Sequence, residues 1–397
     1  MELLKLLLVA SLSSLLIGQL VRISFFSEIA ALTFTDIFVL LTVVLFLIYS
    51  LFIKKSLTFP RNFFWPASFF VMAAFASTVL AIDYFQPVEM VISASFLLRF
   101  IVFLLISVVV FRVIEKQKIY RWLKLILIIG ALFATGGFFQ FFLLSDLSFL
   151  AFYGWDPHQR RVVSSLLDPN FSGIILAIFA TLSISIYLYK KQAVFLFLFL
   201  LFFLVLLLTF SRSSYLAFLA MMLVVGFLKS PRVFLATVTL FAVAFVLASP
   251  VRNRIIGALY LDETSRARLE SWQNALTIFR DHPYFGVGFN TYRFAQANYG
   301  FFPKDAPLGG HSGSGTDSSI LLVFVTTGVL GAFFYWWLLI SIFLSLAKNA
   351  KRNYLKLAAL SSFSGLVVHS QFFNSLFFPQ VMLIFWTIFG LTLKDDS

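Results

Sequence analysis

The sequence is divided into long apolar stretches, each close to the length that a helix needs to cross a bilayer. About 20 mostly apolar residues span the hydrocarbon core, and lipid requires every backbone polar group to be satisfied internally, as in a helix. Only 12% of the residues are charged, against roughly 25% in soluble proteins, which excludes a water-soluble globule. Reading between charged residues, Pro and Gly gives twelve segments: 3–21, 36–53, 63–82, 91–111, 122–144, 170–189, 192–209, 212–228, 232–249, 318–346, 355–372 and 376–393. We therefore predict an all-α polytopic membrane protein with about twelve transmembrane helices, forming a single integral membrane domain over 1–397.

Every second loop between these segments is basic, which predicts the orientation of the chain. Short cytoplasmic loops are enriched in Lys and Arg. The basic loops follow segments two, four, six, eight and ten, and include Lys54, Lys55, Arg112, Lys116, Lys190, Lys191, Lys229, Arg232, Lys351 and Arg352. Both termini are then cytoplasmic, and 250–317 is a large extracytoplasmic loop. The first segment has no small-residue cleavage site, so we expect a retained helix rather than a signal peptide.

The opposite side of the predicted membrane carries an unexpected set of cations. They are Arg160, Arg161, Arg212, Arg252, Arg254, Arg266, Arg268, Arg280 and Arg293, with Lys304. Arg stays charged and can grip phosphate with two parallel hydrogen bonds. The set indicates either a site for a phosphate-bearing membrane ligand, or contacts with anionic headgroups and with acidic residues of the same loops. The net charge of +13 is therefore interpreted at the membrane, with no nucleic-acid partner expected.

Two arginines have unusual positions. Arg212 lies in Thr209-Phe-Ser-Arg-Ser-Ser-Tyr215, at the outer boundary between two apolar segments. Simple snorkelling would not require this hydroxyl-rich setting, so we interpret Arg212 as a ligand-binding residue. Arg99 is the only charge well inside a segment. It either faces a functional polar cavity or bonds to a carbonyl of a neighbouring helix.

The outer loop contains a predicted amphipathic helix over 264–280. Such a helix is expected to lie in the membrane interface. Arg268 borders its apolar face and can point toward the bundle, whereas Arg266 falls on the polar face. The apolar face consists of Leu269, Trp272, Leu276 and Phe279.

A polar, Gly-rich run from Gly309 leads into the tenth segment and contains two candidate catalytic residues. His311 and Asp317 could act as base or ligand, although a lone loop His is often a solvated bystander. Asp317 could instead cap the following helix. The chain has no Cys, no spaced His pair and no P-loop, so we expect no metal site, no cofactor and no ATP hydrolysis.

Four stretches together resemble the O-antigen ligase and O-antigen polymerase superfamily of lipid-linked glycan transferases. They are Arg161 to Asp168-Pro-Asn170, Thr209 to Arg212, Arg268 to Gly288, and Gly309 to Gly331. The resemblance covers the C-terminal two-thirds of the chain. It implies metal-independent glycosyl transfer at the outer face of the bacterial inner membrane. The implied donor is a polyprenyl-diphosphate-linked glycan, and the implied acceptor is a sugar hydroxyl on a lipid-linked glycan.

The resemblance also implies roles for individual residues. Arg212 and Arg268 would bind the diphosphate, with Arg161 and Arg99 as further candidates. Ligases typically carry a His-Asn-like pair eleven and ten residues before a Gly. Counting back from Gly328 gives Asp317 and Ser318, so Asp317 would serve as the general base or orient His311. This departure favours a polymerase-like or divergent member.

Two other classes of function are alternatives to the transferase. A transporter or flippase for a lipid-linked or amphiphilic solute would also be polytopic. The predicted helices, however, contain no Asp or Glu well inside them, and coupled transport usually needs such acids. A membrane scaffold without activity would leave the outer arginines unexplained.

Overall fold

The computed structural model is built almost entirely from helices, and it describes residues 1–24, 31–54, 59, 61–302 and 315–396. Each of the twelve predicted segments overlaps a helix. These helices are α1 (Glu2–Ser13), α2 (Phe34–Ile48), α3 (Arg61–Leu80), α4 (Pro87–Val113), α5 (Ile119–Leu143), α6 (Pro169–Lys190), α7 (Ala193–Leu207), α8 (Arg212–Leu228), α9 (Pro231–Leu247), α13 (Ser319–Ala347), α14 (Tyr354–His369) and α15 (Pro379–Asp396). The all-α prediction is confirmed.

Only some of these helices qualify as membrane-spanning by length and composition. Over the described residues, six helices are long and apolar enough to cross a membrane. A seventh is added if α9 and α10 (Ser249–Leu259), which are bent by 100° at their junction, count as one span. The apolar helices α7 and α8 are shorter. The chain is thus a multi-pass membrane protein, and twelve crossings remain a prediction.

The first predicted segment, 3–21, is helical only in its first part. After α1 the chain makes a short 3₁₀ turn, Ser14–Leu16, and then leaves the helix. Gly18 has φ +53°, and the backbone N–H of Gln19 donates to the Ser165 carbonyl at 2.8 Å. A Cβ at Gly18 would lie only 2.5 Å from the same carbonyl oxygen. The close approach to Ser165, which the sequence pattern does not reveal, ends the helix early.

A two-stranded antiparallel sheet, absent from the sequence prediction, precedes α2. It consists of β1 (Arg22–Ser24) and β2 (Ala31–Thr33). Thr33 ends β2 and caps α2: its hydroxyl faces the Asp36 backbone N–H, and its own N–H donates to the Asp36 carboxylate at 2.9 Å. This reciprocal capping box makes the strand lead directly into the helix.

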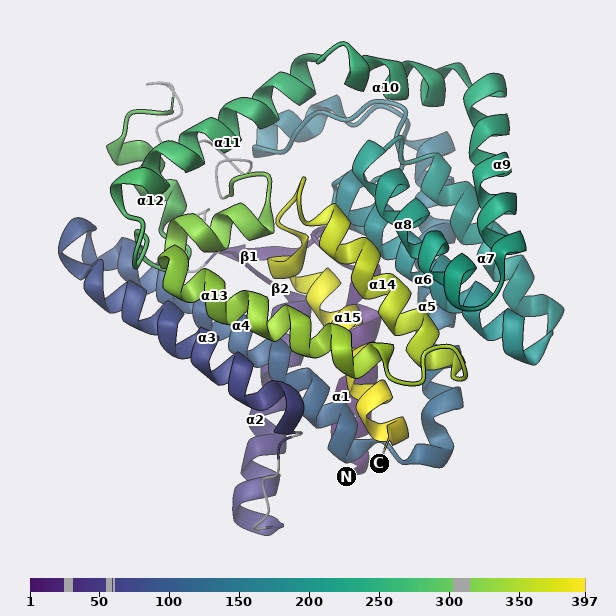
Figure 1. Cartoon of the computed structure of the whole chain (residues 1–397), viewed down its shortest axis with the longest axis horizontal. Coiled ribbons are helices and arrows are strands. Elements are labelled where there is room, and N and C mark those ends of the chain that lie inside the picture. The colour runs from purple at the N-terminus through teal and green to yellow at the C-terminus, as the bar shows by residue number, and fades with distance from the viewer. Residues whose placement is uncertain (25–30, 55–58, 60, 303–314, 397) are drawn as a thin grey trace.

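Helix α6 is buried on all sides within the bundle. Its neighbours include α7, α8 and α14, while α3 packs on α13 and α4 packs on α15. A helix that is apolar all round belongs in a protein or membrane interior. Figure 1 shows both chain termini at one end of the bundle, with α10 and α11 across the opposite end.

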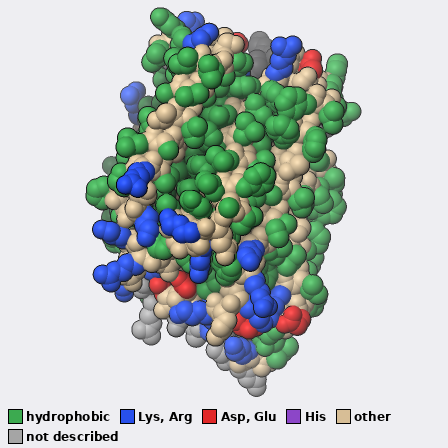
Figure 2. Space-filling view, turned by 90° about the vertical axis from the view of Figure 1, so that its right-hand side faces the viewer, with side chains coloured by type: hydrophobic (Ala, Val, Ile, Leu, Met, Phe, Trp, Pro, Cys, Tyr) green, Lys and Arg blue, Asp and Glu red, His purple; other side chains and the backbone are tan. Residues whose placement is uncertain are grey.

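The outer surface of the bundle is apolar where lipid would contact it. Figure 2 shows hydrophobic side chains over the middle of one face, with Lys and Arg gathered toward the lower end and a few at the upper end. Phe227, for example, is 87% exposed. Soluble monomers rarely expose apolar patches of this extent, so the surface fits a lipid-facing belt.

The described residues between α9 and α13 form three helices: α10, α11 (Glu263–Asp281) and α12 (Tyr292–Asn298). The predicted amphipathic helix 264–280 is confirmed as α11. It begins at its cap Asp262, whose carboxylate accepts from the Ser265 N–H at 3.0 Å, and it ends before His282.

The face that α11 turns toward the bundle differs from the predicted one. Ala275 and Ile278 are buried there, and Arg268 is half-buried on the same face. Leu269 and Leu276 are 40% and 43% exposed. Because an interfacial helix also meets lipid, these leucines do not need protein contacts, so the apolar pattern alone misplaced the centre of the buried face.

Helix α13 is interrupted at Gly328, which has φ 65° and ψ −170°. The backbone groups released by the break bond to the segment that follows α11. The Val287 N–H donates to the Val325 carbonyl at 3.0 Å, and the Val329 N–H donates to the Pro283 carbonyl at 2.8 Å. Residues 283–288 therefore fill the break, as a helix in lipid requires.

This contact depends on glycines from both partners. A Cβ at Gly286 would lie 2.4 Å from the Thr326 carbonyl carbon, and a Cβ at Gly328 would lie 2.2 Å from the Tyr284 oxygen. Both glycines also have positive φ values, which other residues rarely adopt. The break in α13 and the chain after α11 are thus a single packing unit.

Candidate functional site

Arg212 and Arg268 line the same pocket, which opens between the first turn of α8 and the bundle-facing side of α11. We call it the arginine pocket; its volume is about 270 Å³. Its other lining residues are largely apolar: Ser213, Leu216, Leu261, Ser265, Leu269, Trp272 and Phe372. The structure therefore brings together the two arginines that the sequence analysis singled out. Two fixed cations beside apolar walls suit an anionic head attached to an apolar chain.

Arg212 begins α8 and makes a two-bonded ion pair with Asp262. Its Nη1 lies 2.8 Å from Oδ2, and its Nη2 lies 3.1 Å from Oδ1. Burial alone would raise the pKa of Asp262, but hydrogen bonds from Arg212 and Ser265 lower it below its ordinary value. The sequence analysis allowed for pairing between outer arginines and acidic loop residues, and Arg212 is paired in this way.

Arg268 has a different environment, because aromatic rings surround its guanidinium. The guanidinium carbon lies 4.9 Å from the ring centre of Phe373 and 5.7 Å from that of Phe372. Its buried Nε has no hydrogen-bond partner in the described part of the chain. Burial lowers the pKa of Arg268, and the nearby Asp317 carboxylate opposes that shift. Arg266, in contrast, is exposed and bonds to the Leu261 carbonyl, as its predicted polar-face position requires.

Asp317 lies beside the arginine pocket. Its backbone carbonyl accepts from the Trp272 indole N–H at 3.4 Å, and its φ is +50°. The cap of α13 is Ser318, whose hydroxyl accepts from the Leu321 N–H at 3.2 Å. The alternative that Asp317 itself caps this helix is therefore wrong.

The protonation equilibrium of Asp317 is shifted toward neutral pH. Burial raises its pKa to about 6, although the positive charge of Arg268 acts in the opposite direction. A carboxylate with such a pKa can accept a proton near pH 7. His311, the other candidate base, lies outside the described residues.

Arg161 stabilises the loop before α8 rather than lining the arginine pocket. Its Nε donates to the Thr209 carbonyl at 2.9 Å, and its Nη2 donates to the Phe210 carbonyl at 3.3 Å. Burial, with the neighbouring charge of Arg254, lowers the pKa of Arg161 to about 10. Arg161 thus holds the chain that presents Arg212.

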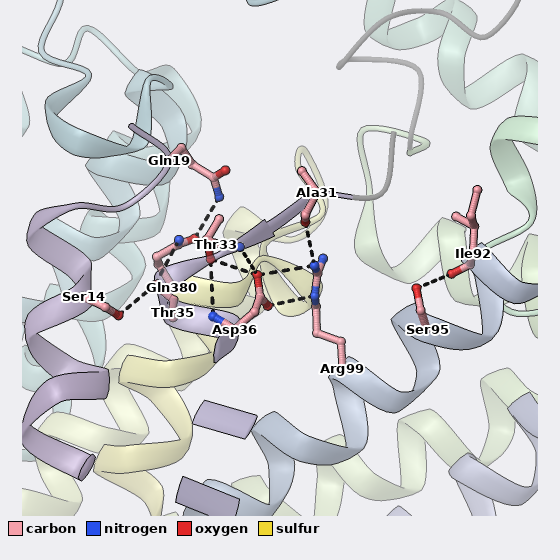
Figure 3. Close-up of polar contacts among 10 residues, drawn as sticks. All are labelled: Ser14, Gln19, Ala31, Thr33, Thr35, Asp36, Ile92, Ser95, Arg99 and Gln380. Carbon is pink, nitrogen blue, oxygen red and sulfur yellow. Dashed lines mark hydrogen bonds and ion pairs between the residues drawn. The ribbon is translucent and has the colours of Figure 1, made fainter. Parts of the chain in front are cut away.

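Arg99 lies in a separate polar cluster, shown in Figure 3. Its Nε is 2.9 Å from the Asp36 carboxylate, and its Nη2 donates to the Ala31 carbonyl at 3.1 Å. Arg99 lines a different cavity, of only about 20 Å³, with Phe96 and Phe100 among its neighbours. Arg99 thus bonds to a carbonyl, as the structural alternative expects, but this carbonyl belongs to β2 rather than to a neighbouring helix. The structure does not bring Arg99 to the arginine pocket.

A buried histidine outside the predicted site residues, His369, contacts the start of α8. His369 Nε2 lies 3.2 Å from the Ser213 hydroxyl and 3.3 Å from that of Ser214, while Nδ1 lies 2.5 Å from Ser375. The imidazole also stacks on Phe373, the ring that contacts Arg268. His369 therefore contacts both the first turn of α8, which carries Arg212, and the Phe373 ring, which contacts Arg268. Two sequence features could have indicated this contact: the Ser-Arg-Ser-Ser run, and a His near the predicted outer end of segment 355–372.

Two of the resemblance stretches meet next to this network. The Asp168 carboxylate caps α6 by accepting from the Asn170 N–H at 2.6 Å. The Asn170 side-chain oxygen accepts from the Ser211 hydroxyl at 2.7 Å. The Asp-Pro-Asn motif thus supports the start of α8. Within the described residues, no group of three or more His, Asp or Glu side chains is positioned to hold a metal ion.

Comparison with protein families identifies the part of the chain that contains this site. Residues 196–336 match the family model described as O-Antigen ligase. The match covers about a third of the chain, and this part is similar to O-antigen ligases. The matched region includes Arg212, Arg268 and Asp317, and the predicted resemblance is confirmed. A comparison with curated proteins finds no match. The match and the apolar helices support a membrane protein of the O-antigen ligase type, with a role in polysaccharide biosynthesis.

Proposed function

We propose that this chain is a membrane glycosyltransferase of the O-antigen ligase or polymerase type, which transfers a glycan from a polyprenyl-diphosphate donor to a sugar hydroxyl of a lipid-linked acceptor. The observation that carries the proposal is the shared pocket of Arg212 and Arg268. Two arginines can bind the diphosphate, and the apolar walls suit the first part of the prenyl chain. The rest of the chain would remain in lipid, because the pocket lies beside the interfacial helix α11.

We further propose a topology of twelve crossings in one membrane domain of the bacterial inner membrane, with both termini in the cytoplasm. The basic loops after every second helix support this orientation. The position of both termini at the end opposite α10 and α11 also supports it (Figure 1). The arginine pocket would then open at the outer face, where lipid-linked glycans are transferred.

The proposed reaction is a direct displacement at the anomeric carbon of the donor. The acceptor hydroxyl oxygen forms the new bond to this carbon while the bond to the diphosphate oxygen breaks. The diphosphate leaves with the electron pair, and Arg212 and Arg268 stabilise its increasing negative charge. Since these guanidinium groups supply the positive charge, the proposed transfer needs no metal ion or cofactor.

Asp317 is the proposed base that accepts the proton of the acceptor hydroxyl. Its raised pKa, about 6, and its position beside Arg268 support this role. His311 is the alternative base, in which case Asp317 would orient it. A ligand diphosphate would also compete with the Asp262 carboxylate for Arg212, because both anions use the same two guanidinium hydrogens.

A transfer assay with purified protein and a polyprenyl-diphosphate oligosaccharide tests the proposal. A ladder of products indicates a polymerase, and a single shifted acceptor indicates a ligase. Absence of any turnover, with movement of the lipid-linked glycan across vesicle bilayers, would instead support the transporter or flippase alternative. Transfer should persist in EDTA; loss that a divalent ion restores would contradict the metal-independent mechanism.

A further inference from the structure

A second pocket lies at the other end of α11, and its lining is unlike that of the arginine pocket. We propose that this pocket binds the sugar rings of a glycan. It has a volume of about 550 Å³ and lies between the outer end of α3, the chain after α11, and α12. We call it the aromatic pocket. Its size is typical of a small-molecule site. The residues used in the argument are Tyr84, Asp281, His282, Tyr284, Asn298 and Tyr299.

Aromatic rings are unusually open in this pocket. Tyr84 is 65% exposed and Tyr284 is 76% exposed. A tyrosine ring offers an apolar face and a polar hydroxyl at its edge. A sugar ring is complementary, because its C–H groups form an apolar face and its hydroxyls point outward. Stacking of sugar rings on these tyrosines would cover apolar surface that is otherwise solvated.

Polar groups suited to sugar hydroxyls accompany the rings. The Tyr299 hydroxyl donates to the Asp281 carboxylate at 2.6 Å. The imidazole of His282 lies edge-to-face with Tyr84, with 5.9 Å between the ring centres. Asn298 adds an amide that can both donate and accept. Carboxylate, amide and phenol groups beside aromatic rings can therefore bond to several hydroxyls of one saccharide.

The charge of the aromatic pocket distinguishes a saccharide from an anionic lipid. Among its described lining residues there is one carboxylate, Asp281, and no Lys or Arg. The arginine pocket has the opposite character, with Arg212 and Arg268 in its lining. A phosphate-bearing headgroup would meet a negative charge without a compensating cation. The electrostatics therefore favour an uncharged polyol over a phospholipid.

The two pockets are joined by α11, so a single donor could use both. Arg268 and Asp281 are 13 residues apart on this helix (281 − 268), which corresponds to about 20 Å at 1.5 Å per residue. Several linked sugars can span such a length. The further step, that the bound glycan is that of the donor, rests on the proposed function. Figure 1 shows α11 running from α10 toward α12, along the path that such a glycan would follow.

The aromatic pocket is also preorganised. Tyr284 belongs to the segment 283–288 that bonds across the break in α13, where the Val287 and Gly288 N–H groups donate to α13 carbonyls at 3.0 Å. The Phe285 carbonyl next to it accepts from the Ser77 hydroxyl of α3 at 2.5 Å. Because its backbone is fixed on two sides, this segment loses little conformational freedom on binding.

Direct binding tests the pocket without requiring transfer. The probe is the free glycan released by mild acid from the lipid-linked glycans of the native host, added to the full-length protein in nanodiscs. Saturation-transfer difference NMR should detect binding to the wild type. Tyr284→Ala and Asp281→Asn should each weaken binding by about two- to tenfold, whereas Tyr284→Phe should retain most of it. Phe227→Ala removes a similarly exposed ring elsewhere and should leave binding unchanged.

The outcomes separate this proposal from the proposed function. Absence of glycan binding by the wild type, or equal binding by Tyr284→Ala, would overturn it. A lower melting temperature of Tyr284→Ala in nanodiscs with unchanged glycan binding would identify the pocket as a membrane anchor instead. If the glycan binds but no transfer occurs with any donor, the pocket assignment survives and the proposed function fails. If the glycan binds and transfer also occurs, Tyr284→Ala should reduce the preference of the enzyme for a donor with several sugars over a donor with one.

Discussion

Two hydrogen bonds, of 2.8 and 3.1 Å, join Arg212 to Asp262, so that the first residue of α8 is tied to the residue that caps α11. The proposed diphosphate and the Asp262 carboxylate use the same guanidinium hydrogens. Binding of donor would therefore exchange one anion for another at Arg212. This relationship makes Asp262 a competitor of the donor as well as a structural residue.

We expect Asp262→Asn to lower the KM for the donor, because it removes the competing charge from Arg212. Asn is as good a helix cap as Asp, so α11 should keep its start. Asp262→Ala is the matched comparison: it removes the charge and also the cap, and should lower the melting temperature. Steady-state kinetics and thermal unfolding distinguish the two. An increased KM in Asp262→Asn would mean that the carboxylate positions Arg212 for the donor.

Replacing either arginine of the pocket should greatly reduce transfer. A hydrogen bond to a charged group contributes roughly 1.5–3 kcal/mol, so Arg212→Ala or Arg268→Ala should lower turnover by about ten- to a hundredfold. Lys should rescue only partly, because it keeps the charge but loses the planar fork. The exposed Arg266 is the control and should tolerate Ala. Near wild-type transfer by both Ala variants at normal membrane abundance would remove the basis for the diphosphate site.

Asp317 should give transfer a characteristic pH dependence. Its pKa of about 6 predicts that activity rises with pH through this value and then levels off, as the carboxylate forms. Asp317→Asn should abolish this dependence together with most of the activity. A pH profile with an unchanged midpoint in this variant would assign the proton transfer to another residue.

The same pKa predicts an opposite effect on stability. The folded-state pKa of Asp317 is raised, so folding favours the protonated form, and this contribution to stability is lost as the pH rises from about 4 to about 6. Asp317→Asn should therefore raise the melting temperature at pH 7 relative to the wild type, while the difference at pH 4 is small. Loss of activity with gain of stability is expected of a catalytic group, and equal loss of both would indicate a structural one.

Gly286 should be intolerant of even the smallest side chain. A Cβ there would lie 2.4 Å from the backbone of α13, and the φ of +68° adds strain. Gly286→Ala should therefore lower the melting temperature clearly, as measured by thermal unfolding in detergent. Gly300→Ala is a useful control, because its φ of +69° is similar but its Cβ would meet no atom within 4 Å. If both substitutions lowered the melting temperature equally, the strained φ, rather than the contact with α13, would be the cause of the destabilisation.

The proposed orientation can be tested with single cysteines, since the chain has none of its own. Glu270→Cys, on the exposed side of α11, should react with an impermeant thiol reagent from outside the cell. Lys351→Cys, in the loop between α13 and α14, should react only after the membrane is permeabilised. The reverse pattern would place every outer arginine on the wrong side for the proposed reaction.

The helices were predictable because each depends on a local pattern. Twenty apolar residues or an amphipathic repeat specify a helix whatever lies elsewhere in the chain. The presence of Arg212 and Arg268 in one pocket was also predictable, because the sequence assigns both residues to the same membrane boundary. These predictions used the depth of a residue in the bilayer and required no knowledge of which helices are neighbours.

The partners of individual side chains could not be predicted in this way. Arg99 pairs with Asp36, 63 residues away, and Arg212 pairs with Asp262, 50 residues away. No local pattern specifies either contact. His369 was passed over because an apolar helix gives no sign that its imidazole meets three hydroxyl groups. Such contacts depend on the order of helices in the bundle, which depth alone does not determine.

The break of α13 at Gly328 limits how this protein can be altered or can diverge. The chain after α11 supplies backbone groups that complete a helix more than 30 residues further on, and glycines on both sides allow the contact. A chimera that exchanged the outer segment with that of a relative, but kept its own α13, would have to preserve this fit at every backbone contact. Recombination between relatives should therefore succeed when 283–288 and α13 are inherited as one block and fail when a crossover separates them.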